Sequence, residues 1–142
     1  MGESTLTAVS AEPLDLSTHL AAVSTASTGA VATFIGQVRD HGPDATDTVV
    51  RLEYSAHPDA ERALAEIVAD VVAPHEDVRV AVSHRVGVLD IGDVAIIAAV
   101  ASSHRDLAFT VCREVVEAVK ARLPVWKKQV LADGSHTWVG SA

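Results

Sequence analysis

Lysine is scarce in this 142-residue sequence, because only three of its eleven basic residues are lysines and all three fall between positions 120 and 128. Arginine carries the positive charge everywhere else. An arginine guanidinium stays protonated near neutral pH, whereas a desolvated lysine amine can lose its proton. Lys120, Lys127 and Lys128 therefore indicate a region that uses an amine, although solvated lysines at a helix end are the simpler interpretation.

Cysteine and aromatic residues are also scarce. The single cysteine, Cys112, excludes an intramolecular disulfide, and its place in a helical pattern favours a buried thiol over a nucleophile. Aromatic residues make up 4% of the sequence against 49% for all apolar residues, so the core must consist of Val, Ala, Leu and Ile. Neither a secretory signal nor an apolar run of membrane-spanning length is present, and we expect a cytoplasmic protein without membrane contact.

The charge balance limits the possible partners. The formal net charge of −8 argues against a nucleic-acid-binding protein or one that binds anionic membranes. An anionic ligand would need a local basic cluster that acts against the overall field. The length predicts a single domain over residues 1–142.

Hydrophobic periodicity predicts an α+β fold, with a mixed or antiparallel sheet and helices packed on it. The expected strands are 6–10, 30–39, 48–56, 78–82, 94–101, 125–130 and 136–139, and the expected helices are 15–23, 58–72 and 103–123. Strands 30–39 and 48–56 could pair as a long-looped hairpin. Alternation in 78–82 predicts one solvent-facing side, whereas 94–101 is apolar on both faces and should be a central strand.

Two basic clusters adjoin the last expected helix. Ser103 is a candidate N-cap with Asp106 three residues later, so His104 and Arg105 stand at a helix N-terminus, where an anion is favoured. A plain capped helix start is the alternative interpretation. At the other end, Pro124 turns the chain between Lys120 and Lys127, and two close ammonium groups would lower each other's pKa.

The seven histidines raise the question of a metal site. They form no i, i+4 pair on a helix, and the one cysteine provides no thiolate cluster, so we expect no metal and no cofactor.

Several segments together resemble the catalytic (large) subunit of molybdopterin synthase, the MoaE family. In chain order they are GAVATFIGQVRDH from Gly29, LEY from Leu52, HRVGVLDIGD from His84, SSHR from Ser102 and KARLPVWKK from Lys120. The similarity extends from about Gly29 to Val139.

The resemblance implies an α/β hammerhead fold and a homodimer within a heterotetramer. Each large subunit would bind a small ubiquitin-like sulfur-carrier subunit, whose Gly-Gly tail enters the active site as a thiocarboxylate. The implied reaction adds two sulfurs to a cyclic pyranopterin monophosphate and gives the dithiolene of molybdopterin. This chain has no Gly-Gly at its end, so it would be the subunit that receives the carrier.

The resemblance also implies site residues. The family's two functional lysines correspond to Lys120 and Lys127. The expected substrate contacts are Gln37, Val38, Arg39, His104, Arg105, Lys120, Lys127, Lys128 and Gln129. Gln37 stands where relatives often carry a lysine, and the chain stops soon after Trp138, where relatives can continue with basic residues that reach a neighbouring site.

Two other functions are compatible with the residues alone. One is a non-catalytic adaptor that binds a ubiquitin-like partner through an apolar sheet edge. The other is a small metal-dependent hydrolase that uses the scattered histidines.

Overall fold

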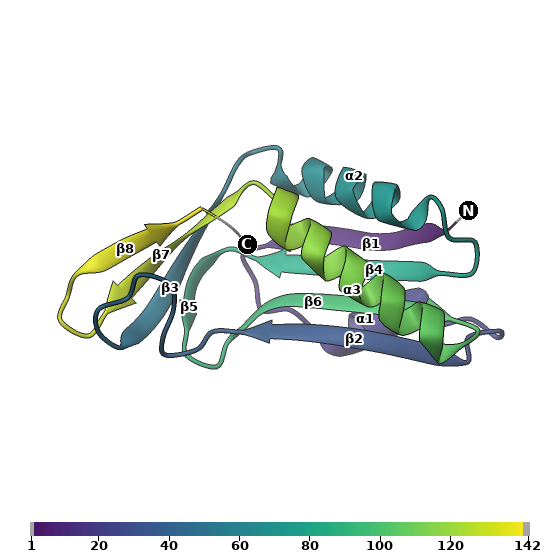
Figure 1. Ribbon diagram of the computed structural model, residues 1–142, viewed down its shortest axis with the longest axis horizontal. Coiled ribbons are helices and arrows are strands. Elements are labelled where there is room, and N and C mark those ends of the chain that lie inside the picture. The colour runs from purple at the N-terminus through teal and green to yellow at the C-terminus, as the bar shows by residue number, and fades with distance from the viewer. Residues whose placement is uncertain (1, 141–142) are drawn as a thin grey trace.

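Two four-stranded sheets form the framework of the protein in a computed structural model that describes residues 2–140 (Figure 1). The first sheet contains, in spatial order, β1 (Glu3–Ser10), β4 (Arg79–Arg85), β6 (Val94–Ser102) and β2 (Ala30–Gln37). The second contains β5 (Gly87–Asp90), β3 (Val49–Ala56), β7 (Val125–Leu131) and β8 (His136–Val139). Only β1 and β4 run parallel, and all other pairs are antiparallel. The predicted α+β class is confirmed.

The three described helices cover both faces of the first sheet. They are α1 (Leu16–Val23), α2 (Ala60–Val72) and α3 (Arg105–Arg122). α2 and α3 pack on one face and α1 on the other (Figure 1). The central strand β6 serves both layers, since Ala98 and Val100 join the α2/α3 core while Ala99 and Ala101 join the α1 core. The prediction of a central strand here is confirmed. None of the described helices is both long enough and apolar enough to cross a membrane.

The prediction of a solvent-facing side for residues 78–82 is wrong. Val80 and Val82 lie in the α2/α3 core as expected, but Ala81 and Ser83 on the opposite face are buried as well. The reason is α1, which covers that face and places His19 Nε2 at 2.7 Å from Ser83 Oγ. A short alternating run does not reveal whether its polar face will meet another helix.

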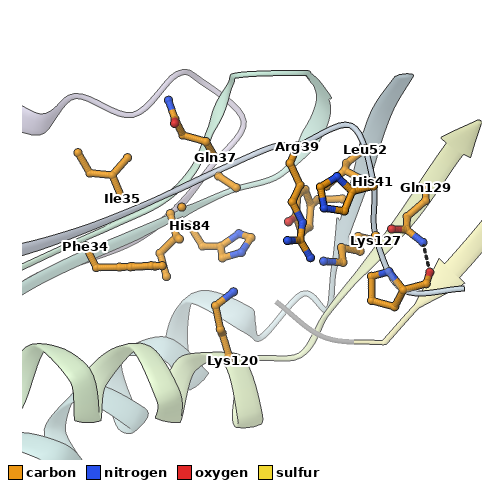
Figure 2. A pocket seen from close by; sticks show the side chains of 16 residues that line it. Phe34, Ile35, Gln37, Arg39, His41, Leu52, His84, Lys120, Lys127 and Gln129 are labelled. Carbon is orange, nitrogen blue, oxygen red and sulfur yellow. Dashed lines mark hydrogen bonds between the residues drawn. The ribbon is translucent and has the colours of Figure 1, made fainter. Parts of the chain in front are cut away.

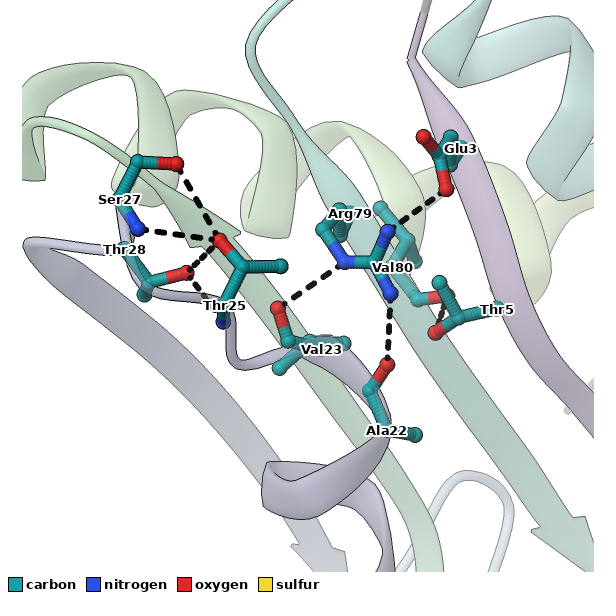
Figure 3. A network of polar contacts seen from close by, with 9 residues as sticks. All are labelled: Glu3, Thr5, Ala22, Val23, Thr25, Ser27, Thr28, Arg79 and Val80. Atoms are coloured by element: carbon teal, nitrogen blue, oxygen red, sulfur yellow. Dashed lines mark hydrogen bonds and ion pairs between the residues drawn. The ribbon is translucent and has the colours of Figure 1, made fainter.

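Arg79, at the start of β4, ties β1 and α1 to the sheet (Figure 3). Its guanidinium donates to the carbonyl oxygens of Val23, at 3.2 Å, and Ala22, at 3.4 Å, and pairs with the Glu3 carboxylate at 2.7 Å. The last carbonyls of a helix lack intrahelical partners, and a cation is favourable there. This contact holds the end of α1 against the sheet.

The expected hairpin between residues 30–39 and 48–56 is also wrong. β2 pairs with β6 in the first sheet, while β3 pairs with β5 and β7 in the second. The polar loop after β2 carries the chain from one sheet to the other. It crosses again between β4 and β5, where Gly87 has a φ of +98° that glycine adopts without strain. A further crossing at Pro124 joins α3 to β7, so several loops and strand ends meet at the junction of the sheets.

Candidate active site

A cavity of about 430 Å³ opens at the junction of the two sheets (Figure 2). Its volume lies within the usual range for small-molecule sites. It is lined by residues of β2, β3, β4, β6, α3, β7 and the loop after β2, namely Phe34, Ile35, Gly36, Gln37, Arg39, His41, Gly42, Pro43, Leu52, Tyr54, His84, Ala95, Ile96, Lys120, Lys127 and Gln129.

Positive charge dominates this cavity in an acidic protein. Arg39, Lys120 and Lys127 line it, and its lining includes no Asp or Glu. Among residues 2–140, these three side chains form no ion pair with a carboxylate. Cations without a protein counter-ion can interact with a bound anion, and the cavity is therefore suited to a phosphate or carboxylate group.

Two different elements bring the lysines together. Lys120 stands in the last turn of α3, which ends when the Leu123 N–H bonds to the Val119 carbonyl, at 2.9 Å, just before Pro124. Pro124 leads into β7, where alternate side chains face the same side, so Lys127 points toward the cavity (Figure 2). The turn at Pro124 predicts this convergence, and both lysines line the cavity.

Lys128 does not line the cavity. As the neighbour of Lys127 on β7 it points to the opposite face, where it is paired in register with Glu53 of β3. An acidic residue directly across the strand pair is a favourable neighbour for a lysine. The described residues therefore do not place Lys128 with the other expected substrate contacts.

The surroundings of Lys127 perturb its amine. Partial burial lowers its pKa first of all, and the positive charges of Lys120 and Arg39 lower it further. Both causes disfavour the ammonium form, because a desolvated cation loses hydration and nearby cations repel it. The Lys127 amine is thus neutral more often at a given pH than a free lysine would be.

Gln129 has a positioning role at the cavity wall. It is 1% exposed, and its Nε2 donates to the Pro43 carbonyl at 2.7 Å and to Thr137 Oγ1 at 2.9 Å. It thereby ties the loop that follows Arg39 to β7 and β8. A Cβ on Gly42 would collide with Gln129 Oε1, so a larger residue there would displace the Gln129 amide.

The two residues before Arg39 lie differently. Gln37 lines the cavity, and its side-chain amide donates to the Gly92 carbonyl at 3.4 Å. Val38 is buried in the core of the second sheet and does not line the cavity, while its N–H bonds to the Asp93 carbonyl at 2.9 Å. Val38 therefore fixes the backbone that presents Arg39.

His104 and Arg105 stand at the other end of α3 from Lys120. Arg105 precedes Lys120 by fifteen residues, which is about 22 Å along a helix axis. Both residues line a separate hollow with Asp106 and Phe109. One chain therefore does not bring His104 and Arg105 to the cavity that contains the lysines.

The start of α3 also differs from the expected capping box. His104 occupies the N-cap position and makes no side-chain capping bond. The Ser103 N–H instead donates to the Asp77 carboxylate at 3.0 Å, which also accepts from Ser102 Oγ at 3.1 Å. The prediction of Ser103 as the cap is wrong because a carboxylate from a distant part of the chain takes up these donors.

Phe34, Tyr54 and His84 are among the cavity residues that the sequence motifs do not single out. Burial raises the pKa of Tyr54 to about 12, and its ring meets that of His84 edge to face with centroids 5.0 Å apart. Both residues lie in segments on which the resemblance rests. Sequence motifs alone do not show which side of a strand faces a cavity that forms between two sheets.

No group of three or more His, Cys, Asp or Glu side chains within residues 2–140 is arranged to hold a metal ion. The histidines have other contacts, such as the 2.9 Å pair between His75 and Glu114. The hydrolase hypothesis finds no support in the described part of the chain.

The fold and site define a class: a two-sheet α+β protein with a cationic small-molecule cavity that contains a perturbed lysine. The model of the MoaE protein family matches residues 9–122. The "Molybdopterin synthase catalytic subunit 1" of Mycobacterium tuberculosis is 41% identical over 130 residues, which span 91% of this chain and 86% of the relative. The chain belongs to the MoaE family.

Solved structures agree with this assignment. Molybdopterin synthase from Staphylococcus aureus superposes with a TM-score of 0.87 at 30% identity, covering 94% of this chain and 96% of that one. The complex of subunits 1 and 2 of the molybdopterin-converting factor from Helicobacter pylori has a TM-score of 0.67, covering 97% of this chain and 89% of that one. Its identity is 16%, so it supports the fold alone.

Proposed function

We propose that this protein is the catalytic subunit of a molybdopterin synthase. It is a sulfurtransferase that converts cyclic pyranopterin monophosphate to molybdopterin, with sulfur from the C-terminal thiocarboxylate of a small ubiquitin-like carrier. The observation that carries the proposal is the carboxylate-free cavity lined by Arg39, Lys120 and Lys127. We expect the reaction to take place in the cytoplasm.

The charge of the cavity fits the proposed reactants. The pterin substrate carries a phosphate and the carrier tail ends in a thiocarboxylate, so both bring negative charge to one place. In a protein with a net charge of −8, a local group of three cations is needed to hold them. Charge-assisted hydrogen bonds of this type are about twice as strong as neutral ones.

The lowered pKa of Lys127 fits the chemical step. A neutral amine can attack the thiocarboxyl carbon, so that a C–N bond forms while the C–S bond breaks and the sulfur leaves as hydrosulfide that adds to the pterin. Alternatively, it can accept and return a proton while sulfur adds to the pterin. Lys120 is a second amine in the same cavity, and the two roles are open to either lysine. Arg39 cannot act in this way and is proposed to bind the anion.

The carrier is proposed to dock near the second sheet. The Helicobacter pylori structure similar in fold is a complex of two subunits. In this chain Trp138 on the edge strand β8 is 59% exposed, and Trp126 on β7 is 43% exposed. Tryptophans are enriched at protein interfaces and are unusual on a free surface. The same surface could serve the alternative function, a non-catalytic adaptor for a ubiquitin-like partner.

His104 and Arg105 are proposed to act from a second copy of the chain. They cannot reach Lys120 of their own chain, since α3 separates them. In a homodimer, which the family resemblance implies, the N-terminus of one α3 can meet the cavity of the other copy. The exposed Phe109, 66% accessible, lies beside them and is suited to such a contact.

The decisive experiment mixes the protein with a thiocarboxylated carrier and cyclic pyranopterin monophosphate, then assays for the dithiolene product. Product formation supports the synthase. Tight carrier binding with no product would contradict the synthase and favour the adaptor.

A further inference from the structure

His84 presents a hydrogen-bond acceptor to the cavity. The side chain is 1% exposed, and its Nδ1 lies 2.7 Å from the Arg85 carbonyl oxygen. A carbonyl can only accept, so Nδ1 carries the proton and Nε2 keeps a free lone pair. Within the described residues, Nε2 makes no hydrogen bond. The ring lines the cavity together with Arg39 and Lys120 (Figure 2).

The imidazole is held in its neutral form. Burial lowers the pKa of His84 to about 4, the bond to the Arg85 carbonyl opposes this shift, and the positive charges of Lys120 and Lys127 add to it. At neutral pH the ring therefore accepts at Nε2 and does not add a fourth positive charge to the cavity. Because Nε2 makes no hydrogen bond within the protein and faces the cavity, it is available to accept one from a bound ligand.

The three cations of the cavity cannot take the place of such an acceptor. The three cations can only donate, and they would hold any small tetrahedral anion in a similar way. Cations alone give affinity but little discrimination between a phosphate ester and a simple anion. The reduced pterin of the proposed substrate carries ring N–H groups, and these donors need an acceptor that cations cannot provide.

We propose that His84 is a specificity-determining residue of the cavity, whose Nε2 accepts a hydrogen bond from a ring N–H of the bound pterin. This inference rests on the proposed function, because it takes the cyclic pyranopterin monophosphate as the ligand. Tyr54 supports the role, since its ring contacts the His84 ring edge to face and limits its rotation. The cations hold the phosphate, and His84 recognises the heterocycle.

The test compares two ligands, the pyranopterin monophosphate and sulfate, which has charge but no hydrogen to donate. His84→Phe retains a ring against Tyr54 and removes the acceptor. It should weaken pterin binding about tenfold or more, because a buried donor of the ligand loses its partner. Sulfate affinity should stay within about twofold, since the three cations remain. His84→Gln, whose amide oxygen can accept, should recover most of the pterin affinity.

His19→Gln is the matched control. His19 is also a buried histidine, but its Nε2 bonds to Ser83 on the α1 side of the first sheet. This variant should leave the ratio of the two affinities unchanged even if the protein is less stable. Thermal melting establishes that each variant is folded before binding is measured.

A measurement on the unaltered protein is independent of these variants. With ¹⁵N-labelled histidine, the Nε2 signal of His84 should move when the pterin phosphate is added and should stay in place when sulfate is added. A folded His84→Phe protein with unchanged pterin affinity, equal losses for both ligands, or an Nε2 signal that ignores the pterin would each overturn the inference. If the unaltered protein binds sulfate but not the pterin, the proposed function itself fails, and the role of His84 fails with it.

Discussion

The positive charge of Lys120 lowers the pKa of Lys127 across the cavity, although the two residues belong to different elements. Lys120 ends α3 and Lys127 lies on β7, with the turn at Pro124 between them. Burial of Lys127 is the larger cause and the charge of Arg39 the smaller one. A helix end and a strand thus place two amines in one cavity, where the environment lowers the pKa of Lys127.

This relationship can be measured directly, because the chain has only three lysines. Labelling lysine with ¹³C at Cε gives three signals whose titration reports three separate pKa values. Lys120→Gln should raise the pKa of Lys127 toward its ordinary value, since one repelling charge is removed. Lys128→Gln is the control and should have little effect, because Lys128 faces away from the cavity. An unchanged Lys127 titration in Lys120→Gln would show that the two amines are not coupled.

The stability of the protein should depend on pH through His84. Its pKa is about 4 in the folded protein against an ordinary value of 6.5. Between these values the unfolded chain binds the extra proton, so stability is complete above about pH 6.5 and falls as the pH drops toward about 4. The loss from this residue is on the order of 3 kcal/mol. His84→Gln should have a flatter dependence of the denaturation free energy over this range, and equal slopes for both proteins would contradict the assigned burial and neutrality.

Gln129 should stabilise both the fold and the anion site. Gln129→Leu removes the bonds to Pro43 and Thr137 and leaves a buried carbonyl without a donor. We expect a loss of about 1–3 kcal/mol in unfolding free energy, together with weaker sulfate binding because the loop after Arg39 is released. Gln37→Leu is the comparison, since Gln37 lines the same cavity but is exposed and should cost little stability. Retention of full stability in Gln129→Leu would rule out the positioning role.

Much of this fold was predictable because its periodic patterns are local. The burial of Val80 and Val82 followed from alternation, and the helix predicted over residues 103–123 corresponds to α3. Burial of Ala81 and Ser83 did not follow, because it depends on α1 packing across the sheet. The single-domain boundary over residues 1–142 stays a prediction.

The site was predictable only in part, for the same reason. Lys120 and Lys127 are joined by a short turn, so their convergence could be inferred from the sequence. His84 and Tyr54 meet only because β4 of one sheet and β3 of the other adjoin at the junction. Arg105 is the converse case. The sequence predicts it as a site residue, but it lies at the far end of α3 from Lys120.

A complementation experiment tests whether Arg105 acts from a second copy. We expect Arg105→Ala and Lys127→Ala homodimers each to lose most activity. If Arg105 acts across the interface, each site combines Lys127 of one copy with Arg105 of the other. A mixed dimer then has one site with both substitutions and one site with neither. Random mixing of equal amounts then restores about a quarter of the sites, since half of the dimers are mixed and each has one intact site. If Arg105 acts within its own chain, mixing restores nothing.

The central claim is that the cavity lysines do chemistry and do not merely hold charge. Single-turnover sulfur transfer from a thiocarboxylated carrier to the pterin tests it most directly, with Lys127→Arg compared against Lys128→Arg. Arginine keeps the positive charge but cannot supply a neutral amine. The account predicts at least about a hundredfold slower transfer in Lys127→Arg, the usual scale for loss of acid–base catalysis. Carrier binding should be retained, and Lys128→Arg should react at nearly the original rate. The account is contradicted if the Lys127→Arg protein and the Lys120→Arg/Lys127→Arg double variant both transfer sulfur at the original rate. The lysines would then be electrostatic anchors.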